Sequence, residues 1–140
     1  MSETYTGSCL CGDVKYQLEG PLKHFQYCHC SRCQKVSGSA HSANLFVPPD
    51  RFKWLSGEAS VGRFEHPDAR YFASCFCKNC GSSLPWLVQG GGNVVVPAGT
   101  LDDDLEIRPS QNLFWADHAC WYEGVDQLPK NDGMPARKKL

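Results

Sequence analysis

Closely spaced cysteines are the feature of this sequence that most restricts how the chain can fold. There are nine cysteines in 140 residues, and all but Cys120 lie in three short clusters. The clusters read Cys9-Leu10-Cys11, Cys28-His29-Cys30-Ser31-Arg32-Cys33 and Cys75-Phe76-Cys77-Lys78-Asn79-Cys80. Thiol groups two or three positions apart can form disulfides, carry redox chemistry or bind a metal ion. The choice between these roles decides what the protein can do.

Metal binding is the role that the cysteine pattern favours. The segment from Met1 to Gly7 lacks a basic stretch followed by an apolar core, so it does not resemble a secretory signal. We therefore expect a cytoplasmic protein, and structural disulfides are rare in that reducing compartment. The odd number of cysteines also argues against a closed disulfide framework.

Length and composition predict one globular domain. A chain of 140 residues with 41% hydrophobic and 21% charged residues can bury a substantial core. The formal net charge of −1 gives no electrostatic reason to expect nucleic acid or an anionic membrane as a partner. No apolar run approaches the roughly 20 residues that would span a bilayer. These features argue against nucleic-acid-binding and membrane-spanning proteins.

Short stretches with strand character predict a mainly β fold. Residues 14–18 alternate apolar and polar side chains, as a half-buried strand does. Turns rich in glycine and proline separate them from further short candidates. These candidates are residues 25–28, 43–47, 63–65, 70–75, 84–88, 93–97 and 114–115. The helical candidate, Ser31 to Ser37, begins inside the second cysteine cluster and stops at Gly38.

Two partitions of the cysteines into metal sites compete. A tight turn between two nearby cysteines, called a knuckle, directs both sulfur atoms toward one ion, and zinc takes four such ligands in a closed structural site. In the first partition, the pairs Cys30/Cys33 and Cys77/Cys80 form one ribbon-like site. The 43 residues between these pairs (34–76) far exceed the about 15–20 that are usual in such ribbons. This partition therefore requires a long insertion.

The second partition uses seven cysteines and leaves no knuckle without a site. Its closed site would contain four thiolates, from Cys9, Cys11, Cys77 and Cys80. Its other site would contain three thiolates, from Cys28, Cys30 and Cys33. A site with three protein ligands keeps a fourth position free, as catalytic zinc sites do. We favour this partition.

Four segments carry recognisable motifs. They read GSCLCGDV at residues 7–14, CHCSRCQKVSGS at 28–39, FCKNCGSSL at 76–84 and PAGTLDD at 97–103. With the Trp121-Tyr122 and Leu128-Pro129 ending, they resemble the glutathione-dependent formaldehyde-activating enzyme family, also called the CENP-V/GFA domain family. The resemblance covers nearly the whole chain, with the motifs in the family's order.

The resemblance implies a Mss4-like fold of short antiparallel strands with little helix, stapled by zinc. The zinc-binding domain would span residues 1–128, followed by a flexible tail at 129–140. Two zinc ions per chain are implied, and their ligands match the second partition. The structural zinc would be held by Cys9, Cys11, Cys77 and Cys80. The second zinc, where substrate binds in that family, would be held by Cys28, Cys30 and Cys33.

The activity that the resemblance implies is the addition of glutathione, or a related thiol, to formaldehyde or another aldehyde. The product is an S-hydroxymethyl adduct, so the enzyme is formally a carbon–sulfur lyase working in reverse. A non-catalytic zinc module that binds glutathione or a protein partner is the alternative. An acceleration of adduct formation above the spontaneous rate would separate the two.

Side chains next to the second cluster have less specific roles. Arg32 and Lys35 flank the cluster and could contact a glutathione carboxylate. His29 lies between two of the proposed ligands and could complete the site as a fourth ligand. We favour a solvent-facing position for His29, or a contact to the ligands from outside the metal's own shell.

Several other side chains are expected to have structural roles. The aromatic side chains predicted to lie in the core are those of Trp86, Phe114, Trp115 and Trp121. Strand alternation places Cys75 on the same face as Cys77. The isolated Cys120 is expected to be a small buried apolar group. The basic end of the chain, Arg137 to Lys139, is expected to be a solvated terminus.

Overall fold

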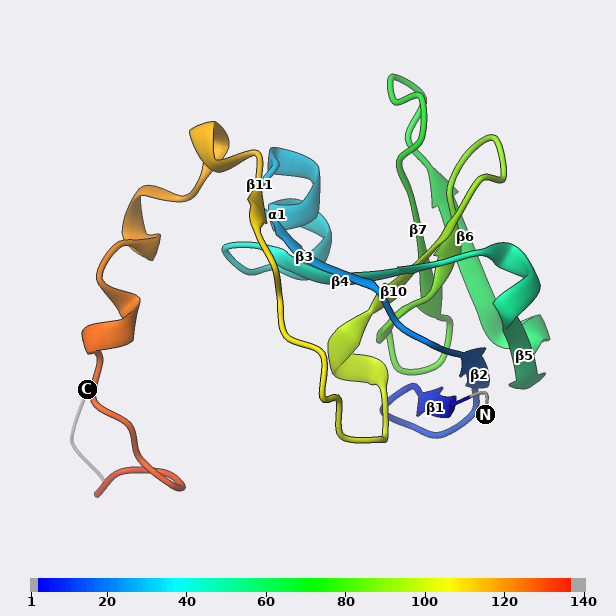
Figure 1. Ribbon diagram of the computed structural model, residues 1–140, viewed down its shortest axis with the longest axis horizontal. Coiled ribbons are helices and arrows are strands. Elements are labelled where there is room, and N and C mark those ends of the chain that lie inside the picture. Colours follow the sequence, from blue (N-terminus) through cyan, green and yellow to red (C-terminus); the bar gives the residue numbers. More distant parts are fainter. Residues whose placement is uncertain (1–2, 137–140) are drawn as a thin grey trace.

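The computed structural model describes residues 3–136 and consists mainly of short β-strands (Figure 1). Three sheets are present in this part of the chain. The first contains β1 (Thr4–Ser8), β2 (Lys15–Glu19) and β5 (Phe52–Ser56), with β2 in the middle. Both strand pairs of this sheet are antiparallel. The predicted mainly β fold is confirmed.

The second sheet has five strands and carries the second cysteine cluster at the end of one of them. Its order is β11 (Asn112–Leu113), β3 (His24–Cys28), β4 (Ser42–Val47), β10 (Val94–Pro97) and β9 (Trp86–Leu87). All pairs are antiparallel except β11 with β3, which is parallel. The third sheet contains β6 (Val61–Glu65), β7 (Ala73–Cys77) and β8 (Ser83–Leu84) in antiparallel order.

The predicted helix is confirmed as α1 (Ser31–Ser37). Cys30 is its N-cap, because the Cys30 sulfur accepts a hydrogen bond from the Cys33 amide at 3.3 Å. Gly38 ends the helix in the left-handed conformation, φ 63°, which glycine adopts without strain. No helix within residues 3–136 is long and apolar enough to cross a membrane.

Single 3₁₀ turns account for the other helical segments of the described chain. They are η1 (Pro49–Arg51), η2 (Glu58–Ser60), η3 (Ala98–Thr100), η4 (Trp115–Asp117), η5 (Cys120–Tyr122) and η6 (Val125–Gln127). Three of the six lie after β11, where the chain leaves the sheets and extends away from them (Figure 1).

Two clusters of buried side chains form the core. The larger one joins the first and second sheets, and its fully buried members include Tyr16, Leu18 and Leu45. The smaller one contains Cys9, Val14, Cys75, Cys77 and Leu84. Cysteines of two sequence clusters therefore meet inside the core.

The segment after β11 contradicts several of the sequence predictions. Residues 114–115 form no strand; β11 ends at Leu113, and Phe114 has a positive φ of 55° that turns the chain. Phe114 and Trp121 are 61% and 64% exposed, and Trp115 is also exposed, so these aromatic side chains do not belong to the core. Cys120 is exposed as well. These side chains lie on the segment after β11, which extends away from the sheets (Figure 1).

The predictions for the other aromatic and cysteine side chains, and for the end of the chain, have different outcomes. Trp86 is half-buried and packs against the smaller core cluster. Cys75 and Cys77 are both buried on one face of β7, as strand alternation predicts. The flexible tail at 129–140 stays a prediction, and the basic end, Arg137 to Lys139, lies outside the described residues.

Gly57 occupies a position that no other residue fits. Its φ is 77°, and a Cβ atom there would overlap the backbone carbonyl of Asp13, next to the first knuckle. We expect Gly57→Ala to lower the free energy of unfolding by about 1–3 kcal/mol, measured by urea denaturation of the metal-loaded protein. Gly92→Ala is the control, because a Cβ at Gly92 meets no atom within 4 Å. Equal stability of the two variants would contradict the prediction.

Candidate functional site

Two knuckles from distant parts of the chain bring four sulfur atoms together. The first knuckle lies between β1 and β2, where the Cys9 amide donates to the Val14 carbonyl at 3.1 Å. The second lies between β7 and β8, where the Cys77 amide donates to the Ser82 carbonyl at 3.0 Å. The sulfur atoms of the site all lie within 4.8 Å of one another, and they belong to Cys9, Cys11, Cys77 and Cys80.

The spacing of these four sulfur atoms fits a tetrahedral metal ion. Cys9 and Cys11 have their sulfur atoms 3.6 Å apart, and those of Cys11 and Cys77 are 3.8 Å apart. A zinc ion with Zn–S bonds of about 2.3 Å would need sulfur–sulfur distances of about 3.8 Å. The four donors are all cysteines, a ligand set that structural zinc commonly uses. The group could therefore hold a metal ion such as zinc.

Ser82 ties the two knuckles to each other. Its hydroxyl accepts a hydrogen bond from the Leu10 amide at 3.0 Å and lies 3.2 Å from the Cys80 sulfur. The hydrogen bond from this hydroxyl lowers the pKa of Cys80 to about 5, which favours the thiolate. The Val14 amide donates to the Cys9 sulfur at 3.3 Å in the same way. These contacts orient the sulfur atoms as metal ligands.

The second group of sulfur atoms forms at the junction of β3 and α1. Cys28 ends β3, Cys30 caps α1 and Cys33 lies in the first turn of the helix. Their sulfur atoms also lie within 4.8 Å of one another, so this group could hold a metal ion too. A hydrogen bond from the Cys33 thiol lowers the pKa of Cys28 to about 6, and the same contact raises the pKa of Cys33. Among the described residues, this group has three donors and no histidine.

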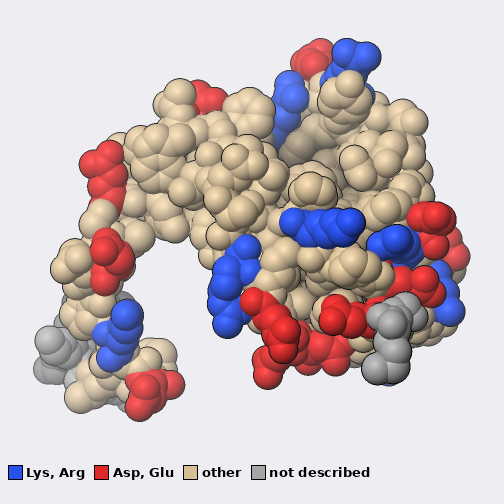
Figure 2. Space-filling model, viewed as in Figure 1, with Lys and Arg blue, Asp and Glu red and all other residues tan. Residues whose placement is uncertain are grey.

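A cavity of about 550 Å³ lies next to the three cysteines and is lined by all of them. We call it the open groove. Its apolar walls include Tyr71, Trp86 and Phe114. Its charged side chains are those of Arg32, Arg70 and Asp117. In Figure 2, basic side chains border the hollow between α1 and the loop that joins β6 to β7.

The two predicted substrate-contacting residues lie in different places. Arg32 lines the open groove with the three cysteines. Lys35, one helical turn further along α1, does not line the groove; it lines a neighbouring depression with Phe64 and His66, and Arg32 lines that depression as well. Arg70 and Asp117 also line the groove.

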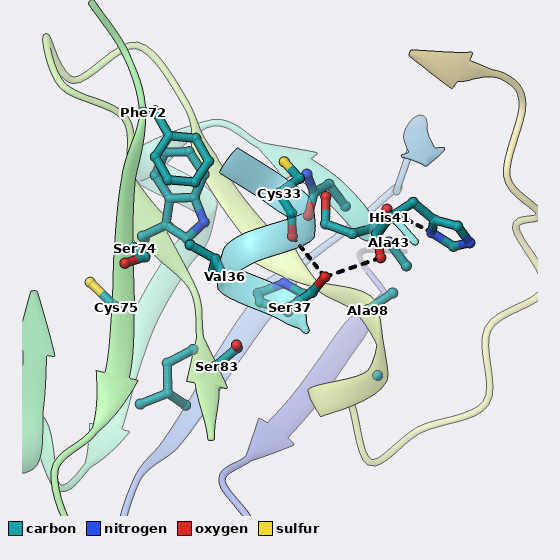
Figure 3. A pocket seen from close by; sticks show the side chains of 16 residues that line it. Cys33, Val36, Ser37, His41, Ala43, Phe72, Ser74, Cys75, Ser83 and Ala98 are labelled. Carbon is teal, nitrogen blue, oxygen red and sulfur yellow. Dashed lines mark hydrogen bonds between the residues drawn. The ribbon is translucent and has the colours of Figure 1, made fainter. Parts of the chain in front are cut away.

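A smaller cavity of about 140 Å³ lies between α1 and β7 (Figure 3). Cys33, Ser37 and Cys75 are among its lining residues. The Ser37 hydroxyl donates to the Cys33 carbonyl at 2.7 Å, which holds the last turn of α1 against its first. Burial raises the pKa of Cys75, and the nearby Arg63 guanidinium partly opposes this effect. Cys75 is thus a neutral buried thiol, outside both groups of sulfur atoms.

His29 is fully buried, so the predicted solvent-facing position is wrong. Its Nε2 lies 2.8 Å from the Asn112 Oδ1, which fixes Nε2 as the donor because an amide oxygen only accepts. The rings of Trp115 and Tyr122 lie against the imidazole, with centroids at 4.9 and 5.4 Å. His29 is absent from the group of metal donors. It instead anchors the cysteine loop to the segment after β11.

Gln34 forms a second link between the same two segments. Its side-chain amide donates to the His29 carbonyl at 2.7 Å and to the Asp117 carbonyl at 3.0 Å. Both carbonyls are thereby held at fixed places relative to α1. The sequence did not point to Gln34 or Asn112. Asn112 binds His29, and Gln34 binds Asp117, over about 80 residues of chain, and Gln34 reaches His29 across a turn. The position of Gln34 directly after the second cysteine cluster is the only local sign.

Removing the Asn112 amide should destabilise this part of the fold. We expect Asn112→Leu to lower the free energy of unfolding by about 1–3 kcal/mol, because the buried His29 Nε2–H would lose its acceptor. Urea denaturation of the metal-loaded variant measures this change. Gln111→Leu is the matched control, since the exposed Gln111 side chain lies next to Asn112 and should change stability by less than about 0.5 kcal/mol. A loss of the same size in both variants would count against the anchoring role.

Comparison with known proteins agrees with this geometry. The profile of the glutathione-dependent formaldehyde-activating enzyme family matches residues 4–117. The chain belongs to this family. The GFA match begins before the first knuckle, spans both groups of sulfur atoms and ends at Asp117, on the wall of the open groove. The resemblance noted in the sequence is thus confirmed.

A solved structure has a similar fold. A crystal structure of a Rhodobacter sphaeroides protein, a structural genomics target, is similar with a TM-score of 0.62 and 15% sequence identity. The similarity covers 76% of this chain and 98% of that one. At this identity the likeness shows the fold alone. No curated protein sequence matches the chain.

Proposed function

We propose that this GFA-family protein binds two zinc ions and adds a thiol, glutathione or a close relative, to formaldehyde or another small aldehyde. The observation that carries the proposal is the group of three cysteines at the wall of an open groove. Three sulfur donors leave a tetrahedral ion one position short, and the groove gives a substrate access to that position. The family membership supports the thiol and aldehyde chemistry.

The two sites have different roles in this proposal. The group of Cys9, Cys11, Cys77 and Cys80 supplies all four ligands of a tetrahedral ion, so no position remains for a substrate. Two of its members also belong to the smaller core cluster. We assign it a structural role. Chemistry belongs to Cys28, Cys30 and Cys33, which face the groove.

The reaction needs a thiolate nucleophile and no oxidant. A zinc ion held by Cys28, Cys30 and Cys33 would be a weak Lewis acid toward water, but it would lower the pKa of a bound thiol enough to supply the thiolate nucleophile. The substrate sulfur attacks the aldehyde carbon and forms the carbon–sulfur bond, while the π electrons of the C=O bond move to its oxygen. That oxygen takes up the proton that the thiol gave up, so the product is the S-hydroxymethyl adduct.

The protein's own residues position the three sulfur atoms and limit the access of water to the groove. Cys28, Cys30 and Cys33 are fixed by the end of β3 and the start of α1, so the groove meets a preformed set of sulfur atoms. The apolar walls limit the water that competes with the thiol for the aldehyde. Arg32 would contact a carboxylate of the thiol, and Lys35 lies beyond the groove wall.

The test is metal content combined with a rate. Zinc-loaded protein should carry two zinc ions per chain and speed up the exchange between glutathione, formaldehyde and S-hydroxymethylglutathione above the spontaneous rate, measured by NMR exchange spectroscopy. Cys120→Ala serves as control, because Cys120 is exposed and outside both groups. Thiol binding without acceleration would show a thiol-binding module instead of an enzyme, and a single zinc per fully loaded chain would refute the two-site arrangement.

A further inference from the structure

Asn44 is a buried polar side chain whose amide has no partner in the described chain. It lies on β4 and is only 9% exposed. Its side-chain amide forms no hydrogen bond within residues 3–136, yet it is not one of the unpartnered groups sealed from solvent, which are His29 Nδ1 and Ser42 Oγ. The amide therefore faces an opening in the interior. Burial of an unpaired amide lowers stability, and such a cost is typical of functional positions.

The strand register places Asn44 on the same sheet face as the second group of sulfur atoms. β3 pairs with β4 so that Cys28 lies opposite Ser42 and Gln26 lies opposite Asn44. Opposite residues of an antiparallel pair project from one face, and diagonal neighbours such as Cys28 and Asn44 are about 7–8 Å apart. The adjacent Leu45 projects from the other face into the larger core cluster. Asn44 thus reaches the side of the sheet where Cys28 carries its thiol.

Two cavities meet at Asn44. The open groove and the smaller cavity are distinct, but both are lined by Cys33, Asn44, Phe72 and Trp86. Figure 3 shows Cys33 and Phe72 at the edge of the smaller cavity. The groove, at about 550 Å³, has room for a thiol, whereas the smaller cavity, at about 140 Å³, has room for only a few atoms. A thiol in the groove and a small aldehyde at this boundary would both lie beside Asn44.

Adduct formation needs a hydrogen-bond donor where the aldehyde oxygen lies. When a thiolate adds to an aldehyde, this oxygen gains negative charge, which N–H donors stabilise most strongly in a site that excludes water. Thiolate sulfur atoms are acceptors and offer the oxygen no such stabilisation. The Asn44 amide has two N–H donors, and no residue of the described chain accepts from either of them.

We propose that Asn44 is a catalytic residue that donates a hydrogen bond to the aldehyde oxygen as the adduct forms. This inference rests on the proposed function and adds to it the residue that stabilises the charge on the oxygen. The substrate sulfur forms a bond to the aldehyde carbon, and the π electrons of the C=O bond move to the oxygen, which the Asn44 N–H holds. The proton that left the thiol then reaches this oxygen, so Asn44 ends the step unchanged.

A structural role for Asn44 is the competing explanation, and the two roles predict different effects on stability. If the amide supported the sheet, its removal would lower the melting temperature and the metal content. If the amide serves the substrate, an apolar side chain of the same shape removes an unpaired polar group and leaves the melting temperature equal or higher. Leucine has this shape.

The test compares Asn44→Leu with the unchanged full chain, both loaded with zinc. We expect the exchange between glutathione, formaldehyde and S-hydroxymethylglutathione, measured by NMR at saturating glutathione and corrected for the spontaneous rate, to slow about a hundredfold. Zinc content and glutathione affinity, from metal analysis and calorimetric titration, should stay within about twofold. Thermal unfolding should occur at the same or a higher temperature. Asn44→Ala, which is too small to overpack the cavity, should show the same loss of rate.

Gln26→Met is the matched control, because Gln26 is the cross-strand partner of Asn44 and lines neither cavity. It removes an amide from the same sheet face and should change the rate less than about twofold. The inference is overturned, and the proposed function stands, if both Asn44 variants keep their rate, if they lose zinc and melt earlier, or if Gln26→Met loses as much rate. If the unchanged protein does not accelerate the exchange, the proposed function fails and the inference fails with it.

Discussion

Replacing Cys77 with alanine is expected to leave a chain that no longer folds cooperatively. Cys77 is buried in the smaller core cluster and brings one of four sulfur atoms to the closed group. A structural zinc contributes about 10–16 kcal/mol to folding, which is as large as the whole net stability of an ordinary domain. Zinc analysis and near-ultraviolet circular dichroism should show metal loss together with loss of fixed tertiary packing.

The control for this prediction is Cys120→Ala, which removes a cysteine that is exposed and lies outside both groups. It should keep the full metal content and unfold at the temperature of the unchanged protein. Addition of a strong chelator to the unchanged protein should reproduce the effect of Cys77→Ala. A Cys77→Ala protein that unfolds normally with its metal content intact would refute the structural role of this group.

Replacing Cys30, unlike replacing Cys77, is expected to remove one metal and the activity while the fold is retained. The Cys30→Ala variant should lose one zinc per chain, its thiol binding and at least about a hundredfold in the rate of adduct formation, while the sheets stay folded. The reason is that Cys30 is half-buried at the groove and belongs to neither core cluster. Metal analysis, circular dichroism and NMR exchange measure the three quantities.

Cys30 is also the N-cap of α1, so its loss has a structural cost of about 1 kcal/mol that must be separated from the loss of metal. Cys30→Ser separates the two, because a serine hydroxyl caps a helix well but is a poor zinc ligand. We expect the serine variant to be about 1 kcal/mol more stable than the alanine variant and still to lack the second metal. A serine variant with two metals and full activity would contradict the assignment of Cys30 as a ligand.

Local sequence patterns predicted the parts of the fold that local chemistry determines. The spacing of the cysteines led to the partition whose two sulfur groups the structure brings together. The α1 bounds followed from the Gly38 stop, where the left-handed conformation suits glycine. Alternation on β7 placed Cys75 and Cys77 on one buried face. In each case the interactions that decide the structure lie within a few residues.

The parts of the fold and the site that were not predicted depend on contacts between residues far apart in the sequence. β1 was not predicted, because it contains Gly7, where any side chain would overlap the ring of Tyr16 on the neighbouring strand. β5 was also missed. The aromatic residues after β11 were assigned to the core because hydrophobic character alone does not show where a chain leaves its sheets. The burial of His29 depends on Asn112 and Tyr122, which no local pattern connects to it.

The closed group of cysteines has a consequence for how the protein is made. Its sulfur contact between Cys11 and Cys77 joins positions 66 residues apart. Closing a loop of that length costs roughly 4 kcal/mol in chain entropy, and the loop must close before all four ligands can bind the ion. Because the fold is not expected to form without the ion, docking of the first and third sheets should occur together with binding of the metal by all four ligands. Newly synthesised chains would then wait for zinc in an open state with reactive thiols, so metal supply would set the yield of folded protein.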